Sequence, residues 1–277
     1  MRRSDVPWAD SLRALAGWNQ TRADWRRLLR LEPDGCFVAE WADAPAGTAT
    51  TLVYGIGLAW IGMVLVHPDL RRRGVGTALL EHSLAHLERR GVRCVKLDAT
   101  PAGRPVYERL GFKPEAALTR WEAAASGPPR PARHPARTWD AGAVGRVAGL
   151  DLRALGVARL GVLRALARAS TSALLIESPS GRVTGFGLAR PGARANYLGP
   201  VVATSGIAAH TLLDGLLAAC ERRRVFCDLR DDDAAAVAWA RRRGFVRQRE
   251  FTRMYRGENL RPANPRLVIA SAGPEIG

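Results

Sequence analysis

The sequence predicts an α/β fold with a mixed sheet, built twice in tandem. Its 277 residues are about twice the length of a typical domain. Each half shows the same order of elements, in which strands are followed by a helix, a strand, a helix and a last strand. Because 47% of the residues are apolar, either half can bury a core, which excludes general disorder.

In the first half, helical patterns come first and strands follow. Asp24, three residues after Thr21, resembles a capping box at the start of the second helix. Apolar periodicity gives the remaining assignments. The expected elements are, in order, helices over 11–16 and 22–31, strands over 36–41, 48–55 and 58–66, a helix over 75–89, a strand over 94–99, a helix over 105–110 and a strand through 118–121.

A stretch rich in proline, small residues and arginine, residues 125–138, divides the chain near its middle. Proline removes amide donors and fixes backbone angles, so this stretch predicts an extended linker. We therefore expect one domain over 1–124 and another over 139–277. The expected elements of the second half are helices within 141–168, strands over 173–177, 183–189 and 195–202, a helix over 206–223, a strand over 225–229, a helix over 233–243 and a strand over 246–254.

Charge, hydropathy and cysteine usage restrict the class of function. The net charge is +16, but the arginines are dispersed through both halves, which disfavours a nucleic-acid partner. The longest apolar stretch, residues 52–66, is shorter than the roughly 20 residues that a membrane helix needs. The four cysteines form no CxxC pair and the five histidines are not clustered. We therefore expect no metal site, reduced thiols and a cytoplasmic location.

The segment that points to chemistry is MVLVHPDLRRRGVGTALL, residues 63–80. A buried strand runs into a short loop, and Gly74 and Gly76 flank the start of a helix. Glycines let the backbone approach a ligand closely, and the unpaired amides of a helix start attract an anion. The three arginines at 71–73 add charge suited to phosphate. The spacing predicts a diphosphate-binding loop.

Other interpretations of this loop need other residues. A Walker A loop requires GxxxxGK followed by Ser or Thr, and the absence of lysine here excludes it. A dinucleotide fingerprint, GxGxxG, would have Leu79 at its third glycine, although Asp98 ends the next strand, where a ribose-binding acid could sit. That interpretation, and a surface basic cluster beside a glycine turn, stay open on the loop alone.

Two motifs together resemble those of the GNAT superfamily of N-acetyltransferases. RRRGVG, residues 71–76, fits [Arg/Gln]-x-x-Gly-x-[Gly/Ala]. VYERLGFKP, residues 106–114, is similar to the second hallmark of the family, in which a tyrosine precedes a Gly-Phe corner. The second half, with GFGLARPG and YLGPVVA, resembles the C-terminal domain of a bacterial tandem subfamily. Two GNAT-like domains in tandem are therefore expected, the second degenerate, without the arginine loop or the tyrosine.

The resemblance implies an enzyme that transfers the acetyl group of acetyl-CoA to a primary amine of a small molecule or peptide, by direct attack in a ternary complex. It implies that Tyr107 protonates the departing thiolate; a core or rim aromatic is the alternative. It also implies that Trp18, Asn19 and Gln20, between the first two helices, lie at the acceptor site, although Trp18 could instead anchor that loop. The cofactor contacts that it implies are Val64, Leu65 and Val66 on the strand, and Arg71, Arg72, Arg73, Gly74, Val75, Gly76 and Thr77 at the loop and helix start.

The sequence departs from the family pattern at three places. Thr100 stands where the family often has Asn. The strand over 58–66 has no carboxylate where many members place a glutamate base, which leaves water, Asp98 or a group from elsewhere to deprotonate the amine. Little chain precedes Ser11, so the usual first strand is expected to be very short or to lie upstream of the given start. A non-catalytic acyl-CoA sensor is therefore the alternative function.

The second half offers fewer candidates. Arg190, Tyr197 and Asp228 occupy strand positions that could line a ligand cleft, with ordinary packing as the alternative. Such a domain could complete the amine site, bind a regulator or buttress the first domain.

Overall fold

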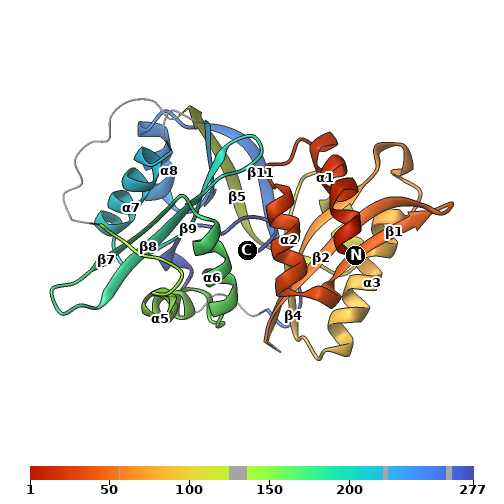
Figure 1. The fold of residues 1–277 in the computed structure, drawn as a ribbon, viewed down its shortest axis with the longest axis horizontal. Helices are drawn as coiled ribbons and strands as arrows, with labels where there is room; N and C mark the ends of the chain where they lie inside the picture. Colours follow the sequence, from red (N-terminus) through yellow and green to blue (C-terminus); the bar gives the residue numbers. More distant parts are fainter. Residues whose placement is uncertain (56, 125–135, 221–223, 260–263) are drawn as a thin grey trace. The chain divides into compact units, whose positions relative to one another are not determined.

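Figure 1 shows the fold in a computed structural model, which describes all residues except 56, 125–135, 221–223 and 260–263. The chain forms two compact units, one built mainly from the first half and the other mainly from the second. Helices and strands alternate in both, which confirms the expected mixed α/β class. Among the described residues, no helix is long and apolar enough to cross a membrane.

The described residues of the first unit form four α-helices, short 3-10 turns and a mixed sheet. Its helices are α1 (Val6–Leu15), α2 (Arg22–Leu31), α3 (Val75–Arg89) and α4 (Arg104–Arg109). Its strands, in sheet order, are β1 (Cys36–Trp41), β2 (Ala44–Tyr54), β3 (Leu58–Val66), β4 (Cys94–Ala99) and the end of β11 (Val246–Gly257). The first three strands are antiparallel, and β3 runs parallel to β4. Helix α1 begins earlier than predicted because Pro7 is tolerated in its first turn.

Helix α3 covers one face of this sheet and defines its core. Its Leu80, Leu84 and Leu87 pack against Ala59 and Ile61 of β3. These leucines recur at helical spacing and the two β3 residues at a spacing of two, so each element presents one apolar face. This packing fixes the helix against the strand that precedes it.

The second unit has the same kind of organisation. Its helices are α5 (Val144–Leu155), α6 (Leu160–Ala169), α7 (Gly206–Ala218) and α8 (Ala234–Arg242). Its strands, in sheet order, are the end of β5 (Lys113–Ala124), then β10 (Arg224–Arg230), β9 (Asn196–Ala203), β8 (Val183–Arg190), β7 (Ser172–Glu177) and β6 (Arg137–Thr138), with β12 (Val268–Ala270) beside β9. Gly156, at φ 76°, ends α5 in a left-handed cap and so divides the helical stretch predicted over 141–168.

Each unit takes a sheet strand from the other half of the chain. From Ala116 on, β5 belongs to the second unit, where it runs antiparallel to β10. From Arg253 on, β11 belongs to the first unit beside β4, and residues 274–277 also belong there. The units therefore do not coincide with the expected uninterrupted domains 1–124 and 139–277. Of the predicted linker, residues 125–135 lie outside the described residues, and Arg137–Thr138 form a strand beside β7.

Candidate functional site

The pairing of β3 with β4 ends partway along both strands. Their parallel register ends at the pair Trp60 and Lys96, although both strands, which are wholly described, continue to Val66 and Ala99. Backbone groups that leave a ladder need other partners, and an extended ligand can supply them. Beyond Trp60, β3 can therefore pair with the amide groups of a bound arm.

Strand β3 carries a β-bulge just beyond this point. Its register with β2 slips by one residue between the pairs Thr50–Gly62 and Thr48–Leu65. Met63, inside the bulge, has a φ of 51°, and Thr48 Oγ1 donates a hydrogen bond of 2.8 Å to its carbonyl. A bulge bends a strand and changes the direction of its backbone groups. A left-handed φ at a non-glycine residue is a strained arrangement that is common at binding sites.

Of the three strand residues predicted to contact the cofactor, Val64 lies inside the bulge and Leu65 and Val66 follow it directly. Leu65 is buried, whereas Val64 and Val66 are half-buried and pack on the cluster that contains Val75 and Leu79 of α3. The strand end and the helix start are thus packed together. The two sequence segments predicted to hold the cofactor lie side by side.

The loop before α3 presents three arginines to solvent. Arg71, Arg72 and Arg73 are all exposed, and Arg71 Nε donates to the carbonyl of Val66 over 3.4 Å. Arg72 has a φ of 62° and Gly74 a φ of 84°. These two left-handed residues turn the chain so that the helix starts directly after the arginines.

The first turn of α3 has neither a side-chain cap nor an acidic residue. The amides of Val75, Gly76 and Thr77 therefore have no partner within the helix. A Cβ built on Gly74 would meet nothing within 4 Å, so a ligand can approach the backbone there. Three guanidinium groups, the free amides and the positive end of the helix dipole together favour a polyanion such as a diphosphate.

Tyr107 lies on α4 and faces the core of the first unit. Its half-buried ring packs on the cluster formed by α3 and β4 and meets Phe112 edge-on at 6.0 Å between ring centroids. Burial raises the pKa of the Tyr107 phenol to about 12. The phenol therefore keeps its proton at neutral pH and can serve as a proton donor.

Asp98, the carboxylate that the sequence offered as a base or a ribose ligand, is held in an ion pair. Its Oδ1 and Oδ2 accept hydrogen bonds of 2.9 and 3.0 Å from Arg253 Nε and Nη2, and its side chain is 2% exposed. A bidentate guanidinium stabilises the ionised carboxylate and occupies both oxygens. This pairing argues against Asp98 as the group that takes a proton from the amine.

The predicted acceptor loop lies between α1 and α2. Trp18 is half-buried and its carbonyl accepts a hydrogen bond of 3.2 Å from Arg13 Nη1, whereas Asn19 and Gln20 are buried. Gln20 Nε2 donates a hydrogen bond of 2.7 Å to Glu275 Oε2. The loop is thus fixed to residues near the other end of the chain.

Residues 274–277 form the part of this region that the sequence analysis missed. Trp60 Nε1 donates to the carbonyl of Pro274 over 2.9 Å, and the Tyr54 hydroxyl donates to that of Ile276 over 2.6 Å. Gln20 and Glu275 are 255 positions apart, and no spacing rule connects positions that far apart. In the sequence, the closing AGPEIG, residues 272–277, contributed only to the resemblance of the second half to the C-terminal domain of the tandem subfamily.

The three candidate residues of the second half have structural partners. Asp228 accepts two hydrogen bonds of 2.7 Å from Arg120, and both side chains are buried. Tyr197 and Arg190 are also buried, with hydrogen bonds to the carbonyls of Ser271 and Ala272. Ordinary packing and pairing, the alternative from the sequence, describes these positions.

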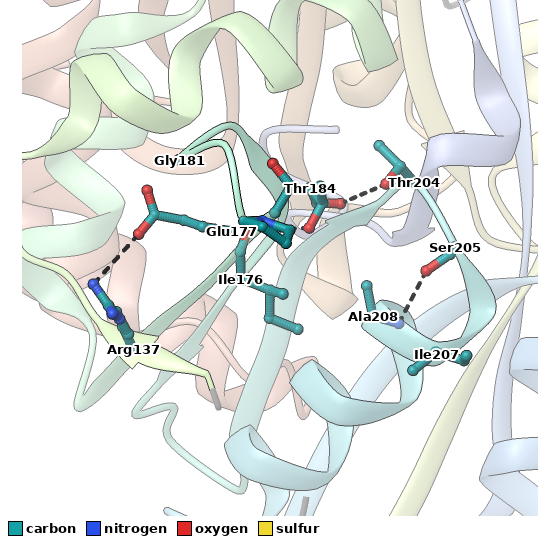
Figure 2. Close-up of a pocket in the computed structure, with 11 residues that line it drawn as sticks. Arg137, Ile176, Glu177, Gly181, Thr184, Thr204, Ser205, Ile207 and Ala208 are labelled. Atoms are coloured by element: carbon teal, nitrogen blue, oxygen red, sulfur yellow. Dashed lines mark hydrogen bonds and ion pairs between the residues drawn. The ribbon is translucent and has the colours of Figure 1, made fainter. Parts of the chain in front are cut away.

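Figure 2 shows a cavity of about 700 Å³ in the second unit, at the start of α7. Ser205 Oγ caps α7 by accepting a hydrogen bond of 3.2 Å from the Ala208 amide. Glu177 lines the cavity and lies 3.8 Å from Arg137. The Glu177 carboxylate and the capped start of α7 distinguish this cavity from the loop before α3, which has exposed arginines and an uncapped helix start.

Family and structural comparisons agree with this geometry. Residues 5–112 match the family described as "Acetyltransferase (GNAT) family", and residues 147–268 match the "Acetyltransferase (GNAT) domain". A putative acetyltransferase from Pyrococcus horikoshii superposes with a TM-score of 0.85 at 23% identity, covering 100% of this chain and 94% of that one. A tandem GNAT protein from the clavulanic acid biosynthesis pathway gives a TM-score of 0.65 at 19% identity, covering 92% and 95%.

Curated relatives match shorter stretches. An uncharacterized N-acetyltransferase of Methanocaldococcus jannaschii is 30% identical over 113 residues, which are 38% of this chain and 49% of the relative. The [ribosomal protein bS18]-alanine N-acetyltransferase of Escherichia coli is 43% identical over 60 residues, which are 21% of this chain and 40% of the relative. The matches thus span less than half of either relative.

The fold defines the class as a protein of two similar α/β units in tandem, the first with exposed arginines at the start of α3. More specifically, the chain belongs to the GNAT acetyltransferase family and carries two GNAT domains in tandem.

Proposed function

We propose that the first unit is an N-acetyltransferase that uses acetyl-CoA as its cosubstrate. The observation that carries the proposal is the exposed Arg71–Arg73 cluster at the uncapped start of α3, beside the bulged end of β3, which no longer pairs with β4. In this proposal the arginines and the amides of Val75, Gly76 and Thr77 bind the diphosphate. The backbone of Val64–Val66 pairs with the pantetheine arm.

The reaction proposed is direct attack of a primary amine on the thioester in a ternary complex. The neutral amine nitrogen forms a bond to the carbonyl carbon, the carbon–sulfur bond breaks, and the Tyr107 phenol gives its proton to the departing thiolate. The proton that the amine nitrogen then loses passes through water to the Tyr107 phenolate, which restores the phenol. With a pKa raised by burial to about 12, the Tyr107 phenol is protonated at neutral pH and has a proton to give, as an exposed phenol also would.

The acceptor proposed is an amine of a small molecule or a peptide. Because this chain is similar to a [ribosomal protein bS18]-alanine N-acetyltransferase, we choose a peptide with a free N-terminal alanine as the first probe. We also infer a cytoplasmic location, which the four free, buried cysteines support.

The test is calorimetric titration of the purified protein with acetyl-CoA, with NAD as the control ligand. Binding of acetyl-CoA with micromolar affinity and no binding of NAD is the expected result, followed by CoA release with amine probes. Binding of NAD instead would restore the dinucleotide interpretation of the loop, and binding of neither would contradict the proposal.

The second candidate is a non-catalytic acyl-CoA sensor. It is favoured by the lack of a carboxylate on β3 and by the ion pair that holds Asp98. Acetyl-CoA binding without CoA release across a panel of primary amines would favour this sensor over the enzyme.

A further inference from the structure

The segment Pro274–Gly277 lies along β3 in the first unit, and β3 has a residue that permits this approach. A Cβ added to Gly62 would come within 2.8 Å of Glu275 Cα and 2.9 Å of its carbonyl oxygen. Both are backbone atoms, so only glycine allows the segment to lie there. The hydrogen bonds from Trp60 and Tyr54 then hold its carbonyls.

The contact with Glu275 is at the place where β3 leaves β4. Trp60 is the last β3 residue paired with β4, Gly62 follows two positions later, and Met63 begins the bulge. Ile61 packs into the α3 core, so Trp60 and Gly62 face the opposite side of the sheet. Helix α1, which precedes the predicted acceptor loop, also contacts β3.

The side chain of Glu275 brings a carboxylate to a strand that has none of its own. Glu275 is 4% exposed, and one of its oxygens accepts the hydrogen bond from Gln20 Nε2. Gln20 is 6% exposed, and its Oε1 is buried without a hydrogen-bond partner among the described residues. An acceptor oxygen buried in this way is costly unless a ligand donates to it.

These two side chains fit one kind of ligand. A carboxylate and an amide oxygen next to each other offer negative charge and a hydrogen-bond acceptor. A primary ammonium group offers positive charge and three donors. An alcohol or a carboxylate ligand would match this pair less well, because the first lacks the charge and the second repels Glu275.

We propose that Gln20 and Glu275 form the binding site for the amine of the acceptor and select a cationic primary amine. This inference rests on the proposed function and adds to it the chemical class of the acceptor. Glu275 takes the place of the carboxylate missing from β3, although it comes from a segment more than 200 residues further along the chain. Its role is to bind and orient the ammonium group beside the opening of β3, where the group gives up a proton to water before its nitrogen attacks the thioester.

The experiment compares wild-type protein with Glu275→Gln and Gln20→Leu in the full chain. Acetyl-CoA affinity is measured by calorimetry, and CoA release is measured with an N-terminal alanine peptide and with 1,4-diaminobutane. We expect unchanged acetyl-CoA affinity and a roughly 10- to 100-fold lower kcat/KM in both variants, mainly through a higher amine KM, because a charge-assisted hydrogen bond is lost.

Tyr54→Phe is the matched control. It removes a hydrogen bond to the same segment, at Ile276, but leaves Gln20 and Glu275 in place. We expect its kcat/KM to stay within about 3-fold of wild type, since a neutral hydrogen bond contributes little. Glu275→Asp, which keeps the charge, is expected to retain more activity than Glu275→Gln. A loss in Tyr54→Phe equal to that in Glu275→Gln would mean that the segment acts only as a structural support.

Other outcomes would overturn the amine site. Unchanged kcat/KM in folded Glu275→Gln and Gln20→Leu proteins would show that the two side chains do not bind the amine. Faster turnover in either variant would mean that residues 274–277 block access of the amine to the thioester. If wild-type protein binds acetyl-CoA but releases no CoA, the amines are titrated directly into the acetyl-CoA complex, and lack of affinity rejects the site. Failure to bind acetyl-CoA at all would instead reject the proposed function, and the amine titration of the free protein would still test the pair.

Discussion

At the scale of single residues, Tyr107 combines a position in the core with a polar group that the core alone does not need. Its ring fills the space between α4 and the α3 cluster, a role that phenylalanine could perform. Only the hydroxyl can give a proton to a thiolate. Packing and chemistry can therefore be separated by one substitution.

Tyr107→Phe is expected to lower kcat by roughly 100-fold, the usual contribution of a general acid, and to leave acetyl-CoA affinity nearly unchanged. The ring contacts persist, so the fold should be retained. Steady-state turnover and calorimetry provide the measurement. Tyr197→Phe, which also removes a hydroxyl from a buried tyrosine but in the second unit, serves as the control and should turn over normally. Equal turnover in Tyr107→Phe and wild type would remove the acid role.

The pH dependence of turnover gives a separate test of the same residue. Burial raises the pKa of Tyr107 from 10 to about 12, so the protonated, proton-donating form persists as pH rises through 10 and is lost only near 12. The ratio of wild-type to Tyr107→Phe turnover should therefore stay constant between pH 7 and pH 10. A ratio that falls with a midpoint near 10 would show that the phenol titrates as if it were in water.

At the scale of elements, α3 has a left-handed glycine at each end, and the two differ in what lies around them. Gly74, at φ 84°, precedes the helix beside the arginines, and Gly91, at φ 68°, follows it. A Cβ at either position would meet nothing within 4 Å. Any substitution thus has the same backbone cost at both ends, without a clash.

Gly74→Ala and Gly91→Ala are each expected to lower the free energy of unfolding by about 1–2 kcal/mol, because alanine disfavours the left-handed region. Only Gly74→Ala should also weaken acetyl-CoA binding, since it changes the backbone that meets the diphosphate. Urea unfolding and calorimetry of both variants measure the two effects. Equal loss of affinity in both would mean that the start of α3 has no special role in binding.

The strand pair β5 and β10 contains a buried ion pair that joins the two halves of the sequence. Arg120 of β5 meets Asp228 of β10 with both guanidinium contacts at 2.7 Å, and its guanidinium carbon also lies within 5.3–5.7 Å of the ring centroids of Tyr197, Phe226 and Phe251. The side chains are 4% and 2% exposed. An unpaired charge in such a place is costly, whereas an apolar pair is not.

Asp228→Asn is expected to lower the free energy of unfolding by about 3–5 kcal/mol, because the Arg120 charge stays buried without its counter-ion. The double variant Arg120→Met, Asp228→Leu should be less destabilised than Asp228→Asn alone. Glu108→Ala, which breaks an exposed pair with Arg104, should cost less than about 1 kcal/mol and provides the comparison. If the double variant were the least stable in urea unfolding, the desolvation argument would be wrong.

At the scale of the whole molecule, the two compact units depend on strands exchanged between the halves of the chain. The first unit contains residues 253–259 and 274–277, and the second contains residues from Ala116 on. A fragment of residues 1–124 would keep Asp98 but lose Arg253, its bidentate partner. It would also expose the edge of β4 and leave β5 without β10.

We therefore expect the fragment 1–124 alone to show no cooperative thermal unfolding and no acetyl-CoA binding. Co-expression with residues 136–277 should restore both, because the second fragment brings β10 and the end of β11. Circular dichroism melts and calorimetry check this. An isolated fragment that melts cooperatively and binds acetyl-CoA would show that the exchanged strand is dispensable.

The local pattern of residues was sufficient for much of the fold and for one side of the candidate site. Alternating and helical periodicity predicted the strands and helices, and the RRRGVG spacing predicted the exposed arginines at the start of α3. The burial of Asn19 and Gln20 and the ion pair of Asp98 were not predicted. The partners of Gln20 and Asp98, which are Glu275 and Arg253, lie far along the chain.

By itself, the sequence determined the tandem α/β organisation and the family resemblance, and it predicted the residues that bind the diphosphate in the proposed function. The elements follow from the apolar period along each segment, and the resemblance follows from short motifs of neighbouring residues. Only the tertiary structure decided that β5 pairs with β10, that β11 ends beside β4, and that Glu275 reaches β3. The strands that follow the two Gly-Phe corners, β5 and β11, have similar patterns of apolar and charged residues, so the local pattern does not decide which sheet each strand joins. Long-range packing and the pairing of buried charges make that choice.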